Sequence, residues 1–251
     1  MEANEYIFGL HAVMEAIEAG RDIDKILVKK DLHSEMAARL HELARHYKVP
    51  MQRVPVEKLN RITRKNHQGV IALLSAVPYQ KLEDIVPQLY EDGIQPFILV
   101  LDGVTDVRNF GGMARTAECC GVNAIVIPER GSVTVNADAV KTSAGALHYL
   151  PVCRERNLYD AVRFLKDNGY QVVAATEKTD FNYTRGDYTG PVAIVMGAED
   201  HGISPDVLKL CDTMVSIPMF GHIGSLNVGV AAGVMMYEVV RQRLEADLEV
   251  I

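Results

Sequence analysis

The chain has 251 residues, of which 48% are hydrophobic and 24% charged, enough for one large domain or two small ones. Its formal net charge of −7 argues against a protein that binds nucleic acid over its whole surface. No apolar run reaches transmembrane length, and the N-terminal MEANEYIFGL lacks the pattern of a secretory signal.

The first 75 residues alternate between helical and strand patterns. Leu10, Val13, Met14 and Ile17 recur on one helix face and predict a helix that ends near Gly20. The pattern then predicts a strand at 25–28, helices at 36–47 and 54–62, and a strand at 69–74. Together these elements predict a small α/β domain over residues 1–75.

The segment from Lys58 to His67 contains four cations and no acidic residue. Residues 1–75 carry 12 Lys and Arg against 10 Asp and Glu, a net charge of +2, whereas residues 76–251 carry 14 against 23, a net charge of −9. The segment is a candidate phosphate-contacting surface. A solvated helix face with a basic last turn explains the same charges equally well.

Residues 76–95 break this pattern and predict a linker between two domains, in which Leu82, Ile85, Val86 and Leu89 could form one short helix. A second α/β series follows over residues 96–251, and strands separated by helices favour a parallel sheet. Its expected strands lie at 97–101, 124–127, 170–174, 192–196 and 213–217, and its expected helices at 109–121, 157–168, 205–210 and 225–245.

The four cysteines show neither a CxxC pair nor a Cys/His metal spacing. Cys119 and Cys120 are adjacent within a predicted helix, where buried reduced thiols are the simplest interpretation. We therefore expect a cytoplasmic protein that holds no metal ion.

Three loops of the second series follow predicted strands and combine glycines with polar side chains. Because the carboxyl ends of parallel strands meet at one edge, where open α/β folds bind ligands, the loops suggest one composite site. They are NFGGMART at 109–116, GAEDHG at 197–202 and IPMFGHIGSLN at 217–227. None of them is a Walker loop or a GxGxxG loop, so nucleoside triphosphate and dinucleotide binding are not supported.

The polar side chains of these loops have both chemical and structural explanations. Arg115 could hold a phosphate or another oxyanion through two hydrogen bonds, or form a salt bridge. Glu199 follows a buried strand and needs partners, for which Arg115 is a candidate; shaping the loop is slightly favoured over proton transfer. Ser225 and Asn227 taken singly fit helix N-caps.

The segments NFGGMART, IVMGAEDHG and IPMFGHIGSLNVGVAAG have the order and spacing of the motifs of SpoU-type (TrmH-like) RNA 2′-O-methyltransferases. The segment KTSAGA at 141–146, before strand-like residues 148–152, and the N-terminal IFGLHAVMEAI also resemble that family, so the resemblance covers nearly the whole chain. It implies an α/β trefoil-knot (SPOUT) methyltransferase domain, a small N-terminal L30e/L7Ae-like substrate-binding domain, and a homodimer. Periodicity does not show a knot, since knots are very rare.

The resemblance also implies S-adenosylmethionine as the cofactor and ribosomal RNA as the partner. Cofactor contacts are expected at Thr176, Gly197, Ile217 and Leu226. The positions expected to be catalytic are Asn109, Arg115, Glu199, Ser225 and Asn227, with Glu199 positioning Arg115. RNA binding by the small domain is expected through Arg53, Lys58, Arg61, Arg64 and Lys65.

The activity that this resemblance implies is 2′-O-methylation of a guanosine ribose in large-subunit (23S) ribosomal RNA. One alternative is a transfer-RNA ribose methyltransferase of the same family. A second is a non-catalytic RNA-binding protein that retains an inactive knot. A third, from the α/β pattern alone, is a small-molecule enzyme with an anion site, which leaves the basic segment unexplained.

Overall fold

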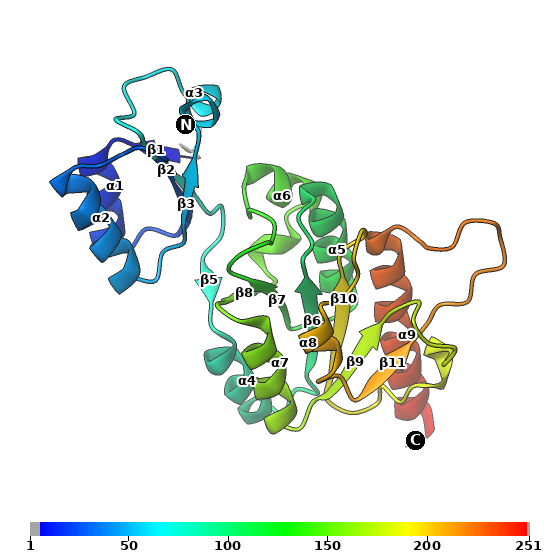
Figure 1. Ribbon diagram of the computed structural model, residues 1–251. Coiled ribbons are helices and arrows are strands. Elements are labelled where there is room, and N and C mark those ends of the chain that lie inside the picture. The colour runs from blue at the N-terminus through cyan, green and yellow to red at the C-terminus, as the bar shows by residue number, and fades with distance from the viewer. Residues whose placement is uncertain (1–5, 250–251) are drawn as a thin grey trace. The chain divides into compact units, whose positions relative to one another are not determined.

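The computed structural model describes residues 6–249, and the chain divides into two compact units (Figure 1). The first unit comprises Met1–Pro78 with Thr134–Ala137, and the second comprises Tyr79–Val133 with Asp138–Ile251. In the described part of the chain, no helix is long and apolar enough to cross a membrane.

The first unit is built on a four-stranded sheet in the order β1-β4-β2-β3. Its strands are β1 (Tyr6–Phe8), β2 (Ile23–Lys29), β3 (Met51–Val54) and β4 (Val70–Leu74), and its helices are α1 (Leu10–Glu18), α2 (Glu35–His46) and α3 (Val56–Ile62). Alternate residues of a strand face opposite sides of the sheet. Ile26 of β2 therefore packs with α1 and α2, and Leu27 packs with Leu59 of α3.

The sequence pattern predicted three helices and two strands of this unit, and the structure contains all five. It missed β1 and β3. β1 has only three residues, too few for periodicity to register. The expected helix at 54–62 begins later, because Pro55 is in extended conformation (φ −60°, ψ 149°) and separates Val54, the last residue of β3, from α3.

The second unit is built on a seven-stranded sheet in the order β11-β9-β10-β6-β7-β8-β5. Every pairing in it is parallel, as the alternation of strands and helices predicts. The strands are β5 (Tyr79–Gln80), β6 (Phe97–Asp102), β7 (Ala124–Pro128), β8 (Val152–Glu155), β9 (Gln171–Ala175), β10 (Val192–Gly197) and β11 (Thr213–Val215).

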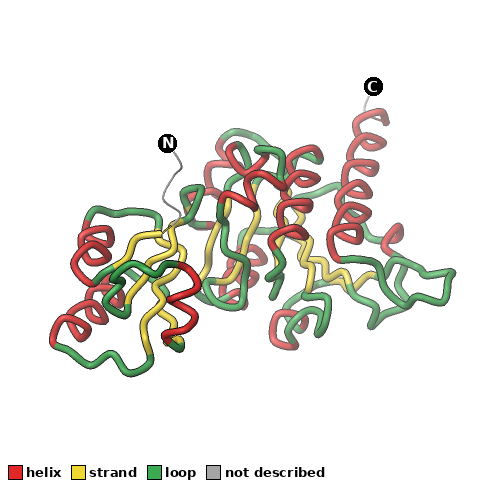
Figure 2. The backbone as a smooth tube through the Cα atoms, turned by 90° about the horizontal axis from the view of Figure 1, so that it is seen from above, coloured by secondary structure: helices red, strands yellow, loops and turns green. Residues whose placement is uncertain are grey.

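Helices cover both faces of this sheet (Figures 1 and 2). They are α4 (Leu82–Glu91), α5 (Val107–Cys119), α6 (Ala137–Thr142), α7 (Leu158–Asp167), α8 (Pro205–Leu208) and α9 (Val228–Glu249), with short 3₁₀ turns at Ala146–His148 and Tyr183–Arg185. The buried core on one face joins α4, α7 and α8 to the central strands. On the other face α9 packs against β10 and α5.

Residues 79–91 of the expected linker at 76–95 are part of the second unit. Tyr79 and Gln80 form β5, which pairs with β8, and Leu82, Val86 and Leu89 of α4 lie in the core. Periodicity predicted the helix but not what its apolar face packs against. The expected strand at 148–152 is also displaced, because a 3₁₀ turn ends at His148 and β8 starts only at Val152.

Arg243 of α9 forms hydrogen bonds to the loops that precede β6 and β10. Its guanidinium donates to the carbonyl oxygens of Gln95 (3.1 Å), Pro96 (2.9 Å) and Gly190 (2.9 Å), and its Nε donates to that of Tyr188 (3.3 Å). Burial lowers the pKa of this side chain below its ordinary value. The arginine is therefore the shared donor for four carbonyls of loops that precede the central strands.

We expect Arg243→Gln to lower the free energy of unfolding by at least about 2 kcal/mol, because partly buried carbonyls lose a charged donor. Urea denaturation followed by circular dichroism measures this change. Arg163→Gln is the matched control: Arg163 is 67% exposed and 3.8 Å from Asp167, so its loss should cost less than about 0.5 kcal/mol. Equal effects of the two substitutions would contradict the role given to Arg243.

Three of the four cysteines are at least partly buried, and Cys119 is exposed. Burial raises the pKa of the Cys120 thiol to about 11 and that of Cys153 to about 12, so both stay protonated at neutral pH. Among the described residues, no group of three His, Cys, Asp or Glu side chains is placed to hold a metal ion.

Candidate active site

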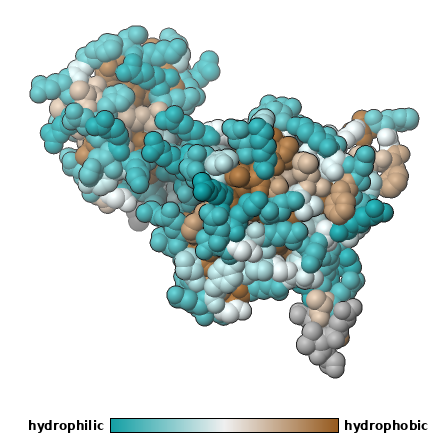
Figure 3. All heavy atoms as spheres, turned by 60° about the horizontal axis from the view of Figure 1, so that its bottom comes forward, coloured by the Kyte–Doolittle hydropathy of each residue, from teal (hydrophilic) through white to brown (hydrophobic). Residues whose placement is uncertain are grey.

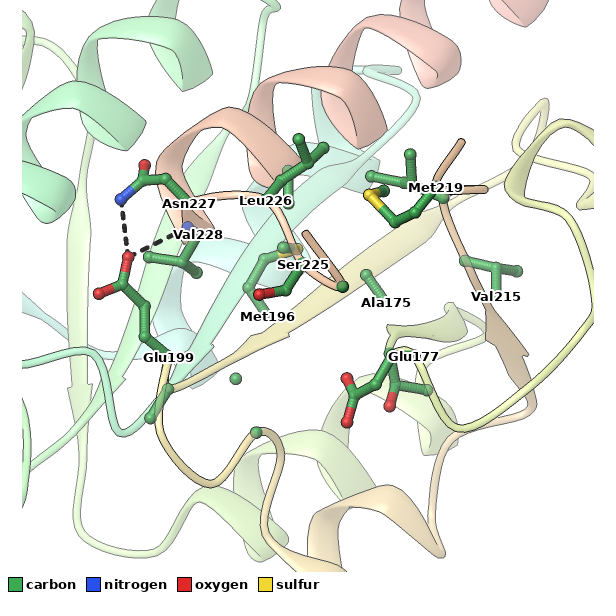
Figure 4. Close-up of a pocket in the computed structure, with 17 residues that line it drawn as sticks. Ala175, Glu177, Met196, Glu199, Val215, Met219, Ser225, Leu226, Asn227 and Val228 are labelled. Carbon is green, nitrogen blue, oxygen red and sulfur yellow. Dashed lines mark hydrogen bonds between the residues drawn. The ribbon is translucent and has the colours of Figure 1, made fainter. Parts of the chain in front are cut away.

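The carboxyl ends of β9, β10 and β11 surround a pocket of about 380 Å³ (Figure 4). Its wall is completed by Gly224 to Val228, the residues that lead into α9. The volume lies within the range of about 300–1,000 Å³ that is typical of small-molecule sites. The pocket therefore occupies the edge of the sheet where the loops were expected to meet.

All four residues predicted to contact a cofactor line this pocket. Thr176 follows β9, Gly197 ends β10, Ile217 follows β11, and Leu226 precedes α9. Sequence reasoning missed Glu177, although this exposed carboxylate directly follows Thr176 at a strand end and its position could have been read from the pattern.

Gly197 permits a very close backbone approach. A Cβ at this position would lie 2.2 Å from the carbonyl carbon of Gly202 and 2.3 Å from the nitrogen of Ile203. The intervening turn is closed by two hydrogen bonds between Ala198 and Gly202, of 3.2 and 2.9 Å. Only glycine fits, because any side chain would displace the turn that forms the pocket wall.

Glu199, in the loop after β10, accepts hydrogen bonds from the starts of α5 and α9. Its Oε1 accepts hydrogen bonds from Nδ2 of Asn227 (2.7 Å), Nδ2 of Asn109 (3.1 Å) and the backbone N–H of Val228 (3.3 Å). Figure 4 shows the bonds from Asn227 and Val228. The second proton of the Asn227 amide is donated to Oδ1 of Asn109 at 3.0 Å. One carboxylate oxygen thus joins the starts of α5 and α9 to the loop after β10.

Asn227 is also the N-cap of α9. Its Oδ1 accepts from the backbone N–H groups of Gly229 (3.0 Å) and Val230 (3.3 Å), as predicted for a residue of this type at a helix start. Ser225 lines the same pocket but is exposed, and within the described residues its hydroxyl has no hydrogen bond. The structure therefore brings together Asn109, Glu199 and Asn227, with Ser225 nearby.

Arg115 does not pair with Glu199, contrary to the expected partnership. It lies six residues after Asn109, about 9 Å further along α5. The side chain is exposed and makes no hydrogen bond or ion pair with any described residue. The face of α5 that packs near Gly229 and Gly233 of α9 is formed by Asn109, Met113 and Thr116. Arg115 lies beside this face and is exposed to solvent.

The five predicted RNA-binding side chains are all exposed in the first unit. They come from β3, from α3 and from the loop after α3: Arg53, Lys58, Arg61, Arg64 and Lys65. Hydrophilic side chains cover most of the face of this unit that Figure 3 shows. Lys65 is held over the ring of Phe8, with its Nζ 5.9 Å from the ring centroid.

Comparison with known proteins identifies both parts of the chain. Residues 96–237 match the SpoU rRNA Methylase family, and residues 6–80 match the RNA 2′-O ribose methyltransferase substrate-binding family. A TrmH family tRNA/rRNA methyltransferase of Staphylococcus saprophyticus is 38% identical over 237 residues, covering 94% of this chain and 95% of the relative. One of Bacillus subtilis is 35% identical over 242 residues, covering 96% and 97%.

Solved structures share the fold. The SpoU methyltransferase AviRb from Streptomyces viridochromogenes has a TM-score of 0.61 at 24% identity, covering 96% of this chain and 90% of that protein. The AdoMet-bound rRNA methyltransferase from Sinorhizobium meliloti has a TM-score of 0.59 at 26% identity, covering 94% and 86%. The architecture of two α/β parts is therefore confirmed, and the knot stays a prediction.

The pocket fits the cofactor that these neighbours bind. The pocket combines apolar walls such as Leu226 with polar groups, which are the hydroxyls of Thr176 and Ser225 and the carboxylate of Glu177. It also includes the close backbone approach at Gly197, and together these features suit a ligand with polar and apolar parts. S-adenosylmethionine is thus the expected cofactor. By its sequence and its fold, the chain belongs to the SpoU family of RNA 2′-O-ribose methyltransferases.

Proposed function

We propose that this protein methylates the 2′-oxygen of a guanosine ribose in large-subunit (23S) ribosomal RNA in the cytoplasm. The observation that carries the proposal is one pocket whose wall contains the four expected cofactor contacts together with Glu199 and Asn227. Glu199 hydrogen-bonds to Asn227 and to Asn109, which lies outside the wall. Support for a ribosomal substrate comes from the Sinorhizobium meliloti neighbour, which is an rRNA methyltransferase.

The cofactor is held by the pocket wall, with Thr176, Gly197, Ile217 and Leu226 as its contacts. When bound, S-adenosylmethionine supplies a methyl group on a positively charged sulfur. The exposed carboxylate of Glu177 places negative charge beside this cationic ligand.

Arg115 acts on the RNA side of the reaction. Because its guanidinium has no partner among the described residues, it is available for two hydrogen bonds to a phosphate or ribose of the target nucleotide. With the cofactor bound, the ribose 2′-oxygen would bond to the methyl carbon as the carbon–sulfur bond breaks, and S-adenosylhomocysteine would leave. The proton of the 2′-hydroxyl would pass to a substrate phosphate or to water. Arg115 keeps its own proton and stabilises the charge that develops on that oxygen.

Glu199 holds the other polar groups in place. We assign it a role toward Asn109 and Asn227, whose amides it fixes, in place of the expected role toward Arg115. Ser225 is free to orient the ribose, since it lines the pocket with an exposed hydroxyl. Fixed donors of this kind lower the barrier by aligning the reacting atoms.

A homodimer is part of the proposal, and its support is an apolar stripe on α9. Val230, Tyr237, Leu244 and Leu248 are 54%, 55%, 59% and 72% exposed. Their spacing of seven, seven and four residues places them on one face of the helix. A second copy of the chain would cover this face. The first unit, residues 1–75 in the predicted division, would bind RNA through its exposed cations.

The test is methylation of purified large-subunit ribosomal RNA and, separately, bulk transfer RNA with isotopically labelled S-adenosylmethionine. Nucleoside mass analysis should find 2′-O-methylguanosine in the ribosomal RNA and no labelled product in the transfer RNA. A labelled nucleoside in transfer RNA alone would refute the ribosomal substrate. No product in either RNA, with cofactor bound, would refute catalysis on RNA and favour a binding role.

A further inference from the structure

The first unit contains a second hollow, also of about 380 Å³, between the end of β2, the start of α3 and the loop that leads into β4. Its wall consists of Lys29, Leu32, Val56 and the run from Lys65 to Gly69. Of these residues only Lys65 was expected to contact RNA. The hollow lies within the basic segment of the sequence and has no role in the chemistry at the cofactor pocket.

The wall is suited to an anion. It includes two lysines, Lys29 and Lys65, and no Asp or Glu. Neither lysine forms an ion pair with a described residue, and the one contact of the Lys65 ammonium is with the Phe8 ring, 5.9 Å from its centroid. The exposed side chains of Asn66 and Gln68 add amide groups, and Leu32 and Val56 add an apolar surface. A nucleotide would use all three kinds of group: its phosphate would contact the cations, the edge of its base the amides, and the face of its base the apolar surface.

The loop that forms this wall is fixed before any ligand binds. The His67 ring is buried, its Nδ1 accepts from the N–H of Gly69 at 3.0 Å, and its Nε2–H donates to Oδ1 of Asn60 at 2.9 Å. Gln68 has a φ of +50°, unusual for a residue with a side chain, and its Oε1 accepts from the N–H of Leu10 at 3.1 Å. Such strain persists where the surroundings enforce it, often at binding sites.

We propose that this hollow binds one unpaired ribonucleotide of the substrate RNA. The phosphate lies between Lys29 and Lys65, and the base packs on Leu32 and Val56. The amide of Asn66 hydrogen-bonds to the base edge, together with the Nε2 group of Gln68, whose Oε1 already accepts from Leu10. A hollow of this size admits a single base and not a duplex, and bases that have left a helix are the ones that proteins read by sequence. This inference rests on the proposed RNA substrate.

The charge part of the proposal is tested on the full-length protein with Lys29→Gln, and Lys30→Gln is the matched control. Lys30 is the next residue along the chain, is exposed, and lies outside the hollow. Binding to large-subunit ribosomal RNA is measured over a series of salt concentrations. Lys29→Gln should lower the slope of log affinity against log salt by about 0.7, the loss of one single-strand phosphate contact. Lys30→Gln should leave the slope unchanged. Lys29→Arg, which keeps the positive charge, should retain the wild-type slope.

The base-reading part is tested with Asn66→Ala and four short homopolymers of A, C, G and U. The wild-type protein should prefer one of them, and the variant should bind all four alike with an unchanged salt slope. Circular dichroism and urea denaturation of each variant check that the first unit is still folded.

If the wild type methylates RNA but Lys29→Gln binds it like Lys30→Gln, or no homopolymer is preferred, the hollow is not a nucleotide site and the proposed function stands. If the wild type neither binds nor methylates RNA, the proposed function fails and this inference fails with it.

Discussion

Gly197→Ala should abolish S-adenosylmethionine binding. The added Cβ would lie 2.2 and 2.3 Å from backbone atoms of Gly202 and Ile203, and no rotamer change relieves a clash with backbone. The turn from Ala198 to Gly202 must therefore move, and it forms a wall of the pocket. Isothermal titration calorimetry measures the loss, and circular dichroism reports whether the chain is still folded.

Gly190→Ala is the control for this substitution. Gly190 lies just before β10, the strand that Gly197 ends, and a Cβ there meets nothing within 4 Å. Cofactor affinity should then equal that of the wild type. Retained binding by Gly197→Ala would show that the turn after β10 is not the cofactor wall.

Arg115→Ala should lower kcat by about 10²–10³ without changing cofactor affinity. This magnitude is typical for removal of one donor that stabilises developing charge. The side chain is exposed and without an internal partner, so stability should change little. Single-turnover methylation with saturating cofactor and RNA separates the chemical step from binding.

Arg108→Ala tests whether the loss of any positive charge from α5 is enough to lower kcat. Arg108 is also exposed and stands on the same helix. Its removal should weaken RNA binding slightly through lost attraction and leave kcat within a factor of about two, since long-range steering affects association more than chemistry. Arg115→Ala with normal turnover would refute its place at the reacting oxygen.

Much of the catalytic architecture could be predicted because buried parallel strands are nearly continuous apolar runs. Ile98 to Val100 and Ala193 to Val195 are fully buried, and both strands lie within a residue or two of the expected ranges. β5 could not be predicted, since a two-residue strand has no period and depends on the partner edge offered by β8.

The residues that the structure brings together at the site, Asn109, Glu199 and Asn227, were among those predicted, but the hydrogen-bond partners of Glu199 were not predicted. Opposite charges made Arg115 the natural partner for Glu199, yet the register of α5 on α9 brings the Asn109 amide to the carboxylate. Sequence spacing gives the helix face of each residue and not the rotation of one helix against another. The hollow near Lys29 was missed for a related reason, because it depends on the positive φ of Gln68 and Gly69.

Asn109 and Asn227 share one Glu199 oxygen, which in the proposed reaction would couple cofactor binding to RNA binding. Asn227 belongs to the cofactor pocket, whereas Asn109 opens the helix that carries Arg115. An RNA that draws the Asn109 amide away from Glu199 would change the hydrogen bonding of Asn227 and hence the affinity for the cofactor. Linkage makes the effect mutual, so the cofactor would alter RNA affinity by the same factor. Whichever ligand arrives first would then set the affinity of the second.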